Sequence, residues 1–239
     1  MRKIGLRHTI SKILRTVGCW GLVLVILSVV TVFCLRWVAP PTSAFMLEKR
    51  CARMLEGSRQ EPIRYQWVDW KFISPHLPLA VVAAEDQKFP FHRGFDVESI
   101  RKALETNGRR HQPRGASTIS QQVAKNLFLW PGRSFIRKGV EVYFTLLLEA
   151  LWPKNRILEV YVNIAEFGDG VFGVQAAATT LLGKTPARLT VDDAALLAAV
   201  LPNPKELQVT RPSRYVLERR QWIKDQAGRL GGPSYLKGL

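Results

Sequence analysis

Residues 80–96 read AVVAAEDQKFPFHRGFD, and the expected fold is organised around this stretch. An apolar run over residues 79–84 ends abruptly in two adjacent acids, Glu85 and Asp86. If a helix covers residues 77–89, Glu85 lies on or beside its buried face. A carboxylate that loses hydration becomes a stronger base, so Glu85 is a candidate for proton transfer. The alternative is that Glu85 only ends the helix and pairs with a nearby cation, Lys88 or Arg93.

The composition indicates one globular domain with an appendage and an anionic partner. The chain has 239 residues, 47% of them hydrophobic, and a formal net charge of +16. A domain of this size can bury a substantial core. Such a basic balance favours nucleic acid, an acidic membrane surface or a phosphorylated substrate as partner.

An apolar segment near the N-terminus decides between these partners. Residues 16–35 contain no charge, and Trp20 and Trp37 lie near the two ends. At about 1.5 Å per residue this segment spans a hydrocarbon layer of roughly 30 Å. A cleaved signal peptide is the alternative, but Leu35-Arg36-Trp37 offers no small-residue cleavage site, so we expect an uncleaved anchor. The residues before it include cations and no acid: Arg2, Lys3, Arg7, Lys12 and Arg15.

The positive-inside rule then places the N-terminus in the cytoplasm and the bulk of the chain across the membrane. An exported domain is not expected to bind nucleic acid. Cys51 is the single cysteine beyond the apolar segment, so the exported part is not expected to hold an internal disulfide.

Residues 115–130 (GASTISQQVAKNLFLW) predict a helix with an unusually polar face. Ser117 or Thr118 can cap a helix that continues to Leu129. Ser117, Gln121 and Lys125 recur at four-residue spacing, and Gln122 and Asn126 form an adjacent strip. The alternative is an ordinary solvated stripe.

A longer helix follows after Pro131-Gly132. Ser134 is expected to cap a helix over residues 135–152, which is apolar nearly all round and therefore expected in the core. Arg137 and Glu141 are four residues apart on this helix. Charged groups in a core helix need partners or a chemical role.

The remaining segments predict a mainly helical chain. Residues 45–55 form a basic amphipathic helix, which lies either at the bilayer surface or on an ordinary protein surface. Residues 65–73 form a short strand or extended arm, and the glycines of 166–173 predict a tight loop with close backbone approach. Further helices are expected over 154–164, over 174–182, over a segment opened by the capping pair Thr190 and Asp193, and in a polar stretch beyond Gln208 followed by a frayed tail.

Taken together, these stretches resemble the glycosyltransferase family 51 module of bacterial peptidoglycan synthesis. The resemblance covers roughly residues 80–204 in ordered blocks. The blocks are Glu85-Asp86-x-x-Phe89-x-x-His92-x-Gly94-Phe95-Asp96, Gly115-Ala116-Ser117-Thr118-Ile119-x-Gln121-Gln122-x-x-Lys125-Asn126-Leu127, Arg137-Lys138-x-x-Glu141 and Arg156-Ile157-Leu158-Glu159-x-Tyr161-x-Asn163, followed by the 168–177 stretch and the 194–204 helix. One departure is Thr180-Leu181-Leu182, where the family usually carries a Tyr-Phe pair.

The resemblance implies a lysozyme-like, mainly α fold with a small membrane-proximal subdomain, preceded by one transmembrane helix. With one anchor and no penicillin-binding domain, the sequence resembles the monofunctional members. The expected organisation is a cytoplasmic tail (1–15), a transmembrane helix (16–37), a linker and membrane-proximal segment (38–76), a catalytic domain (77–210), and a C-terminal helix and tail (211–239).

The resemblance also implies the chemistry: polymerisation of lipid II into β-1,4-linked glycan with release of undecaprenyl pyrophosphate, by a single inverting displacement. Glu85 is then the general base, and Glu141 either orients cations or assists at the pyrophosphate. The expected substrate-binding residues are Asp86, Ser117, Thr118, Gln121, Lys125, Asn126, Arg133, Arg137 and Lys138. No cofactor is expected to be required and no protein metal site is expected, with a divalent cation, Mg²⁺ or Mn²⁺, at the pyrophosphate as the open alternative.

The expected partners are lipid II, the growing glycan strand, inner-membrane lipids and cell-wall synthesis or division proteins. Two other functions compete with this reading. One is a muramidase that cleaves peptidoglycan, although a clustered cation set has no evident use near a neutral sugar. The other is a membrane-anchored assembly factor without catalysis, in which substitution of Glu85 would abolish no reaction.

Overall fold

The computed structural model describes residues 2–56, 62–98, 101, 117–132 and 134–239. The chain divides into two compact units, residues 1–38 and residues 39–239. All site residues discussed below belong to the second unit.

The first unit is a single long helix, α1 (Arg2–Leu35). Its segment Leu14–Leu35 is apolar and long enough to cross a membrane. Leu22, Leu24 and Leu27 each expose more than half of their side-chain surface. An apolar helix with exposed side chains is consistent with the expected single-pass anchor.

The second unit is mainly helical, as expected. Its helices are α2 (Ala44–Leu55), α3 (His76–Glu85), α5 (Ile119–Phe128), α6 (Phe135–Leu151), α7 (Lys154–Ile164), α8 (Gly173–Leu182), α9 (Val191–Val200) and α10 (Arg214–Arg229), with short 3-10 turns η1 (Trp70–Phe72), η2 (Pro186–Arg188) and η3 (Gly232–Leu236). The finer domain boundaries expected at 77 and 211 stay predictions.

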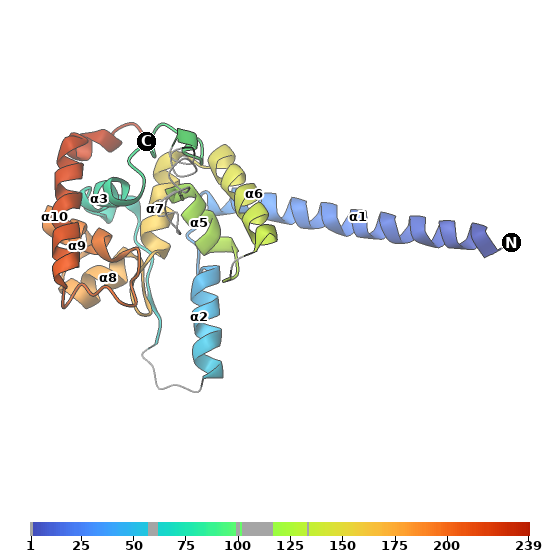
Figure 1. The fold of residues 1–239 in the computed structure, drawn as a ribbon, viewed down its shortest axis with the longest axis horizontal. Coiled ribbons are helices and arrows are strands. Elements are labelled where there is room, and N and C mark those ends of the chain that lie inside the picture. The colour runs from blue at the N-terminus through green and yellow to red at the C-terminus, as the bar shows by residue number, and fades with distance from the viewer. Residues whose placement is uncertain (1, 57–61, 99–100, 102–116, 133) are drawn as a thin grey trace. The chain divides into compact units, whose positions relative to one another are not determined.

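Helix α3 lies at the centre of the unit. Every residue from Leu77 to Ala83 is buried. Helices α9 and α10 pack beside α3, whereas α5 packs against α6 and α7 (Figure 1). The alanine-rich sequence of α9 permits a close approach to α3, since alanine side chains add little width. The core therefore surrounds the helix that ends in Glu85.

A small sheet with strand order β1-β3-β2 was expected only in part. Strand β1 (Arg64–Tyr65) pairs in parallel with β3 (Val171–Phe172), and β2 (Glu166–Gly168) pairs with β3 as a hairpin. The expected arm over 65–73 is therefore a short strand followed by η1. Two- and three-residue strands leave little periodicity to detect, since strand alternation repeats only every second residue.

The end of one helix and the caps of two others can be compared with the expectation. Helix α3 ends at Glu85 rather than at residue 89, because Asp86 leaves the helix with φ −160° and ψ 76°. Thr118, not Ser117, caps α5, and Ser134 caps α6 as expected. Asp96 is a residue type that caps helices, and the sequence after it predicts a helix. Val97 and Glu98 are helical, but most of that predicted helix lies outside the described residues.

The expectation that α6 is a core helix was wrong. Only Glu141, Thr145 and Leu148 are buried along its length. Phe135 is 99% exposed and Ile136 77% exposed. The apolar sequence of α6 therefore covers an outer surface, and its inward strip carries a carboxylate.

The expectation of a frayed C-terminal tail was also wrong. Residues 232–236 form η3, which contacts α3. The Tyr235 hydroxyl donates to the Gln87 carbonyl at 2.6 Å, and the Tyr235 ring meets that of Phe91 edge-on. These contacts join the end of the chain to the segment that follows Glu85.

Helix α2 uses its cations within the protein. Lys49 pairs with Glu166 and, at 2.6 Å, with Asp169, while Arg53 lies 2.9 Å from Asp169. The hydrogen bond from Lys49 lowers the pKa of Asp169. These two cations therefore bind the β2–β3 hairpin, which supports the protein-surface alternative over the headgroup one for this face.

Gly173 is the position where a side chain is least tolerable. Its φ is +79°, and an added Cβ would lie 2.3 Å from the Asn163 carbonyl oxygen. We predict that Gly173→Ala lowers the free energy of unfolding by roughly 2–4 kcal/mol, measured by urea denaturation. Gly139→Ala, at an open site within α6, is the matched control and should stabilise by about 0.5–1 kcal/mol. Equal effects at both positions would contradict this reading.

Candidate functional site

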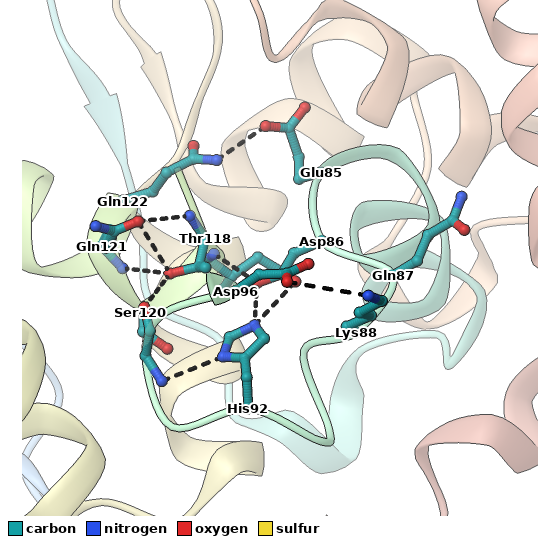
Figure 2. A network of polar contacts seen from close by, with 12 residues as sticks. Glu85, Asp86, Gln87, Lys88, His92, Asp96, Thr118, Ser120, Gln121 and Gln122 are labelled. Atoms are coloured by element: carbon teal, nitrogen blue, oxygen red, sulfur yellow. Dashed lines mark hydrogen bonds and ion pairs between the residues drawn. The ribbon is translucent and has the colours of Figure 1, made fainter. Parts of the chain in front are cut away.

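The candidate base lies where the buried helix α3 reaches the surface. Glu85 is the last residue of α3 and is half-buried. Its Oε2 accepts a hydrogen bond of 2.9 Å from Nε2 of Gln122 on α5 (Figure 2). Lys88 instead pairs with Glu98, so the alternative pairing of Glu85 with Lys88 is not what the structure shows. Oε1 of Glu85 makes no hydrogen bond to any described residue and can receive a proton.

The adjacent carboxylate faces inward. Asp86 is 8% exposed and accepts from the Ile119 backbone N–H at 3.0 Å and from Nε2 of His92 at 2.9 Å (Figure 2). Nδ1 of His92 accepts from the Gly94 N–H at 3.1 Å, so Nε2 carries the hydrogen that is donated to Asp86. Asp86 therefore ties the end of α3 to the first turn of α5.

A capping box completes this connection. Thr118 Oγ1 accepts from the Gln121 N–H at 3.3 Å, and Gln121 Oε1 accepts from the Thr118 N–H at 3.0 Å. The Thr118 hydroxyl also donates to the Gly94 carbonyl at 2.7 Å. Helix α5 is thus fixed to the segment that follows α3.

These contacts bear on four expected substrate-binding residues. Asp86, Thr118 and Gln121 are buried and use polar atoms within the protein. Ser117 is exposed and precedes α5, so the expected single strip through Ser117, Gln121 and Lys125 does not form. Direct contact of any of the four with a substrate stays a prediction.

A group of cations surrounds the second carboxylate. Glu141 of α6 is 3% exposed, with Lys138 Nζ 2.5 Å from Oε1 and Arg137 Nη1 3.5 Å from Oε2. Both oxygens of Glu141 therefore face cations. Glu149, which could also have neutralised these cations, pairs with Lys154 at 2.8 Å and accepts from Ser120.

The charges of both candidate catalytic carboxylates, Glu85 and Glu141, act on Lys125. Burial lowers the pKa of Lys125; the charges of Glu141 and Glu85 oppose that shift, while those of Arg137 and Lys138 add to it. Its Nζ lies 5.6 Å from the ring centroid of Phe45. The site thus combines a half-exposed base with a cluster of cations, which suits proton removal beside a developing anion.

Two of the polar atoms near this cluster have protein neighbours but no hydrogen-bonding partner. Nε of Arg137 and Oδ1 of Asn126 are buried and form no hydrogen bond to the residues that the structure describes. A guanidinium whose Nε–H makes no hydrogen bond within the protein can donate one to a phosphate oxygen. Arg133 lies outside the described residues, so its expected role stays a prediction.

A mixed-charge cleft of about 440 Å³ lies between α2 and the β2–β3 hairpin, and Glu85, Lys125 and Glu141 are not among its lining residues. Phe45, which contacts Lys125, also lines the cleft. In the described ranges, no three His, Cys, Asp or Glu side chains gather closely enough to hold a metal ion. The expectation that no cofactor is required is not tested by that observation and stays a prediction.

Sequence reasoning missed two residues that act on Glu85. Gln122 was placed only in a polar strip, and Tyr161 only in a motif. The Tyr161 hydroxyl donates to Gln122 Oε1 at 3.1 Å. No local pattern could have found this link, because the three residues come from three helices.

Comparison with known proteins gives consistent matches over most of the chain. The sequence model described as Transglycosylase matches residues 52–228. A biosynthetic peptidoglycan transglycosylase of Xanthomonas campestris pv. campestris (strain B100) is 53% identical over 210 residues, which cover 88% of this chain and 85% of that protein. A protein of the same name from Xylella fastidiosa (strain M23) is 52% identical over 216 residues, covering 90% of this chain and 89% of that protein.

Proposed function

The chain belongs to the family of biosynthetic peptidoglycan transglycosylases, and we propose that it polymerises lipid II into β-1,4-linked glycan strands with release of undecaprenyl pyrophosphate. The observation that carries the proposal is one site that combines a half-exposed Glu85 with the cations Lys125, Arg137 and Lys138. A hydrolase acting on neutral glycan has no evident use for these cations, whereas a pyrophosphate leaving group does.

Glu85 acts as the general base in this proposal. The 4-hydroxyl oxygen of the acceptor forms a bond to the anomeric carbon of the donor. The bond between that carbon and the pyrophosphate oxygen breaks, and its electron pair leaves with the pyrophosphate. The hydroxyl proton passes to Glu85, whose other oxygen is held by Gln122. A single displacement on an α-linked donor inverts the anomeric centre and yields the β product.

The cations stabilise the charge that develops on the leaving group. Lys125 and the free Nε of Arg137 supply positive charge and a donor to the phosphate oxygens. Glu141 orients this group, because both of its oxygens already face cations. In this proposal no metal is required, and a chelator added to the assay measures any contribution from Mg²⁺ or Mn²⁺.

We further propose that the catalytic unit works at the periplasmic surface of the inner membrane. Helix α1 supplies a span of sufficient length, and the cations before it favour a cytoplasmic N-terminus. The exposed apolar residues of α6, Phe135, Ile136 and Leu146, together with Trp130, suit contact with lipid near a lipid-linked substrate. Cell-wall synthesis or division proteins remain expected partners.

Glu85→Gln tests the base. We predict that this variant loses polymerisation of labelled lipid II by at least about 100-fold, roughly 2.7 kcal/mol of transition-state stabilisation, while its thermal unfolding stays close to wild type. Gel-resolved glycan is the measurement, and release of soluble fragments from mature sacculi is assayed in parallel. Turnover within about tenfold of wild type would remove Glu85 from the base role. Fragments without polymer would show that the reaction is cleavage.

Lys125 should set the alkaline limit of activity. Burial lowers the pKa of Lys125, so its charge is lost at a lower pH than that of an ordinary lysine, and the leaving group then loses a cation. We predict that polymerisation falls on the alkaline side in wild type and that Lys125→Arg, which stays charged, moves this limb to higher pH at a reduced maximum rate. Lys125→Ala should cost about 100-fold at neutral pH. Lys71→Ala, at an exposed lysine, is the control, and an unchanged alkaline limb in Lys125→Arg would contradict the assignment.

Cys51 reports the membrane orientation. It is exposed on α2, and Cys19 and Cys34 lie in α1. We predict that a membrane-impermeant maleimide added to intact spheroplasts labels Cys51 and that Cys51→Ser abolishes the labelling. Labelling that appears only after the inner membrane is lysed would reverse the proposed topology.

A further inference from the structure

Two consecutive hydrogen bonds connect a buried tyrosine to the proposed base. The Tyr161 hydroxyl donates to Oε1 of Gln122 at 3.1 Å, and Nε2 of Gln122 donates to Oε2 of Glu85 at 2.9 Å. The three residues come from α7, α5 and α3. The amide is therefore held at both ends.

The chemistry of the three groups selects one orientation of the amide. A carboxylate can only accept hydrogen bonds, so the amide must present its NH₂ group to Glu85. Its oxygen then faces Tyr161, whose hydroxyl can donate. The reversed amide would place its oxygen against the Glu85 carboxylate, which is repulsive. The Glu85 carboxylate thus selects this orientation, and the hydrogen bond from Tyr161 to the amide oxygen holds the amide in it.

The Tyr161 hydroxyl is buried and stays protonated, so it remains a hydrogen-bond donor. Tyr161 is 2% exposed on α7, between neighbours that are themselves buried, Val160 and Val162. Burial raises the pKa of its hydroxyl well above the usual value, and the nearby charges of Glu85 and Asp86 act in the same direction. The hydroxyl therefore keeps its proton throughout the working pH range.

We propose that Tyr161 is a positioning residue for catalysis, whose hydroxyl orients the Gln122 amide so that Glu85 presents its free Oε1 to the acceptor hydroxyl. This inference rests on the proposed function, since Glu85 must be the base. It concerns residues that do not themselves exchange a proton with substrate.

Other charged groups near Glu85 would remain unchanged if this link were removed. Lys125 acts on Glu85 from α5, Asp86 is its chain neighbour, and Arg219 of α10 donates to the Ala84 carbonyl at 3.0 Å. A change in the pH dependence after removal of the Tyr161 hydroxyl therefore reports on the amide rather than on these charges.

Tyr161→Phe keeps the buried ring and removes only the donor. In steady-state polymerisation of lipid II, kcat should fall about tenfold while KM changes by less than about twofold, because the loss arises after binding. The acidic limb of the pH–rate profile should move to higher pH, since the carboxylate loses a fixed donor. Tyr65→Phe is the matched control: its hydroxyl donates to the Pro40 carbonyl at 2.5 Å, and both kcat and the pH profile should stay unchanged.

A double-mutant cycle decides whether Tyr161 acts through Gln122. Gln122→Met removes the amide at similar volume, and adding Tyr161→Phe to it should cause no further loss of kcat. Losses that multiply, or an acidic limb that does not move in Tyr161→Phe, would overturn the proposal.

If Tyr161→Phe does not fold, as judged by its thermal midpoint, Gln122→Met alone provides the test. A normal kcat and a normal pH profile in Gln122→Met would then overturn the proposal. A wild-type protein that makes no glycan would instead refute the proposed function.

Discussion

The buried carboxylate of Asp86 is the interaction on which the site depends. It accepts hydrogen bonds from the first N–H of α5 and from His92, and it stands directly after the last residue of α3. A buried carboxylate without donors is costly, so α3, α5 and the intervening segment are held in one arrangement. In that arrangement Glu85, one residue earlier, makes its hydrogen bond to Gln122 rather than to the partners of Asp86.

Three carboxylates in this region have three different environments. Asp86 accepts hydrogen bonds from two protein donors, Glu141 faces two cations, and Glu85 keeps one oxygen without a partner among the described residues. Environment rather than residue type therefore distinguishes the three carboxylates, and this difference supports the proposed roles of Glu85 as the base and Glu141 as the orienting group. The same separation explains why a polar residue in a family motif need not touch substrate, since Thr118 and Gln121 cap a helix.

Helix α6 departs from the usual rule that apolar side chains are buried and charged ones exposed. Its apolar sequence would normally be buried, yet Phe135 and Ile136 are exposed while Glu141 is buried. This reversal places a charged group inward beside Lys125 and leaves apolar side chains outward. Under the proposed function, an apolar outer surface and a charged inner strip suit a substrate that has both an apolar tail and a pyrophosphate.

The sequence by itself determined the apolar segment long enough to cross a membrane, the helical character, the caps at Ser134 and Thr190, and the place of Glu85 directly after a buried apolar run. Such features depend on residues within a few positions of one another, where helical periodicity and side-chain capping act. Only the tertiary structure decided that Gln122 donates a hydrogen bond to Glu85 and accepts one from Tyr161. It also decided that Asp86 connects α3 to α5 and that α6 faces outward. Those outcomes depend on how separate helices pack, and packing partners that lie dozens of residues apart leave no periodic trace in the chain.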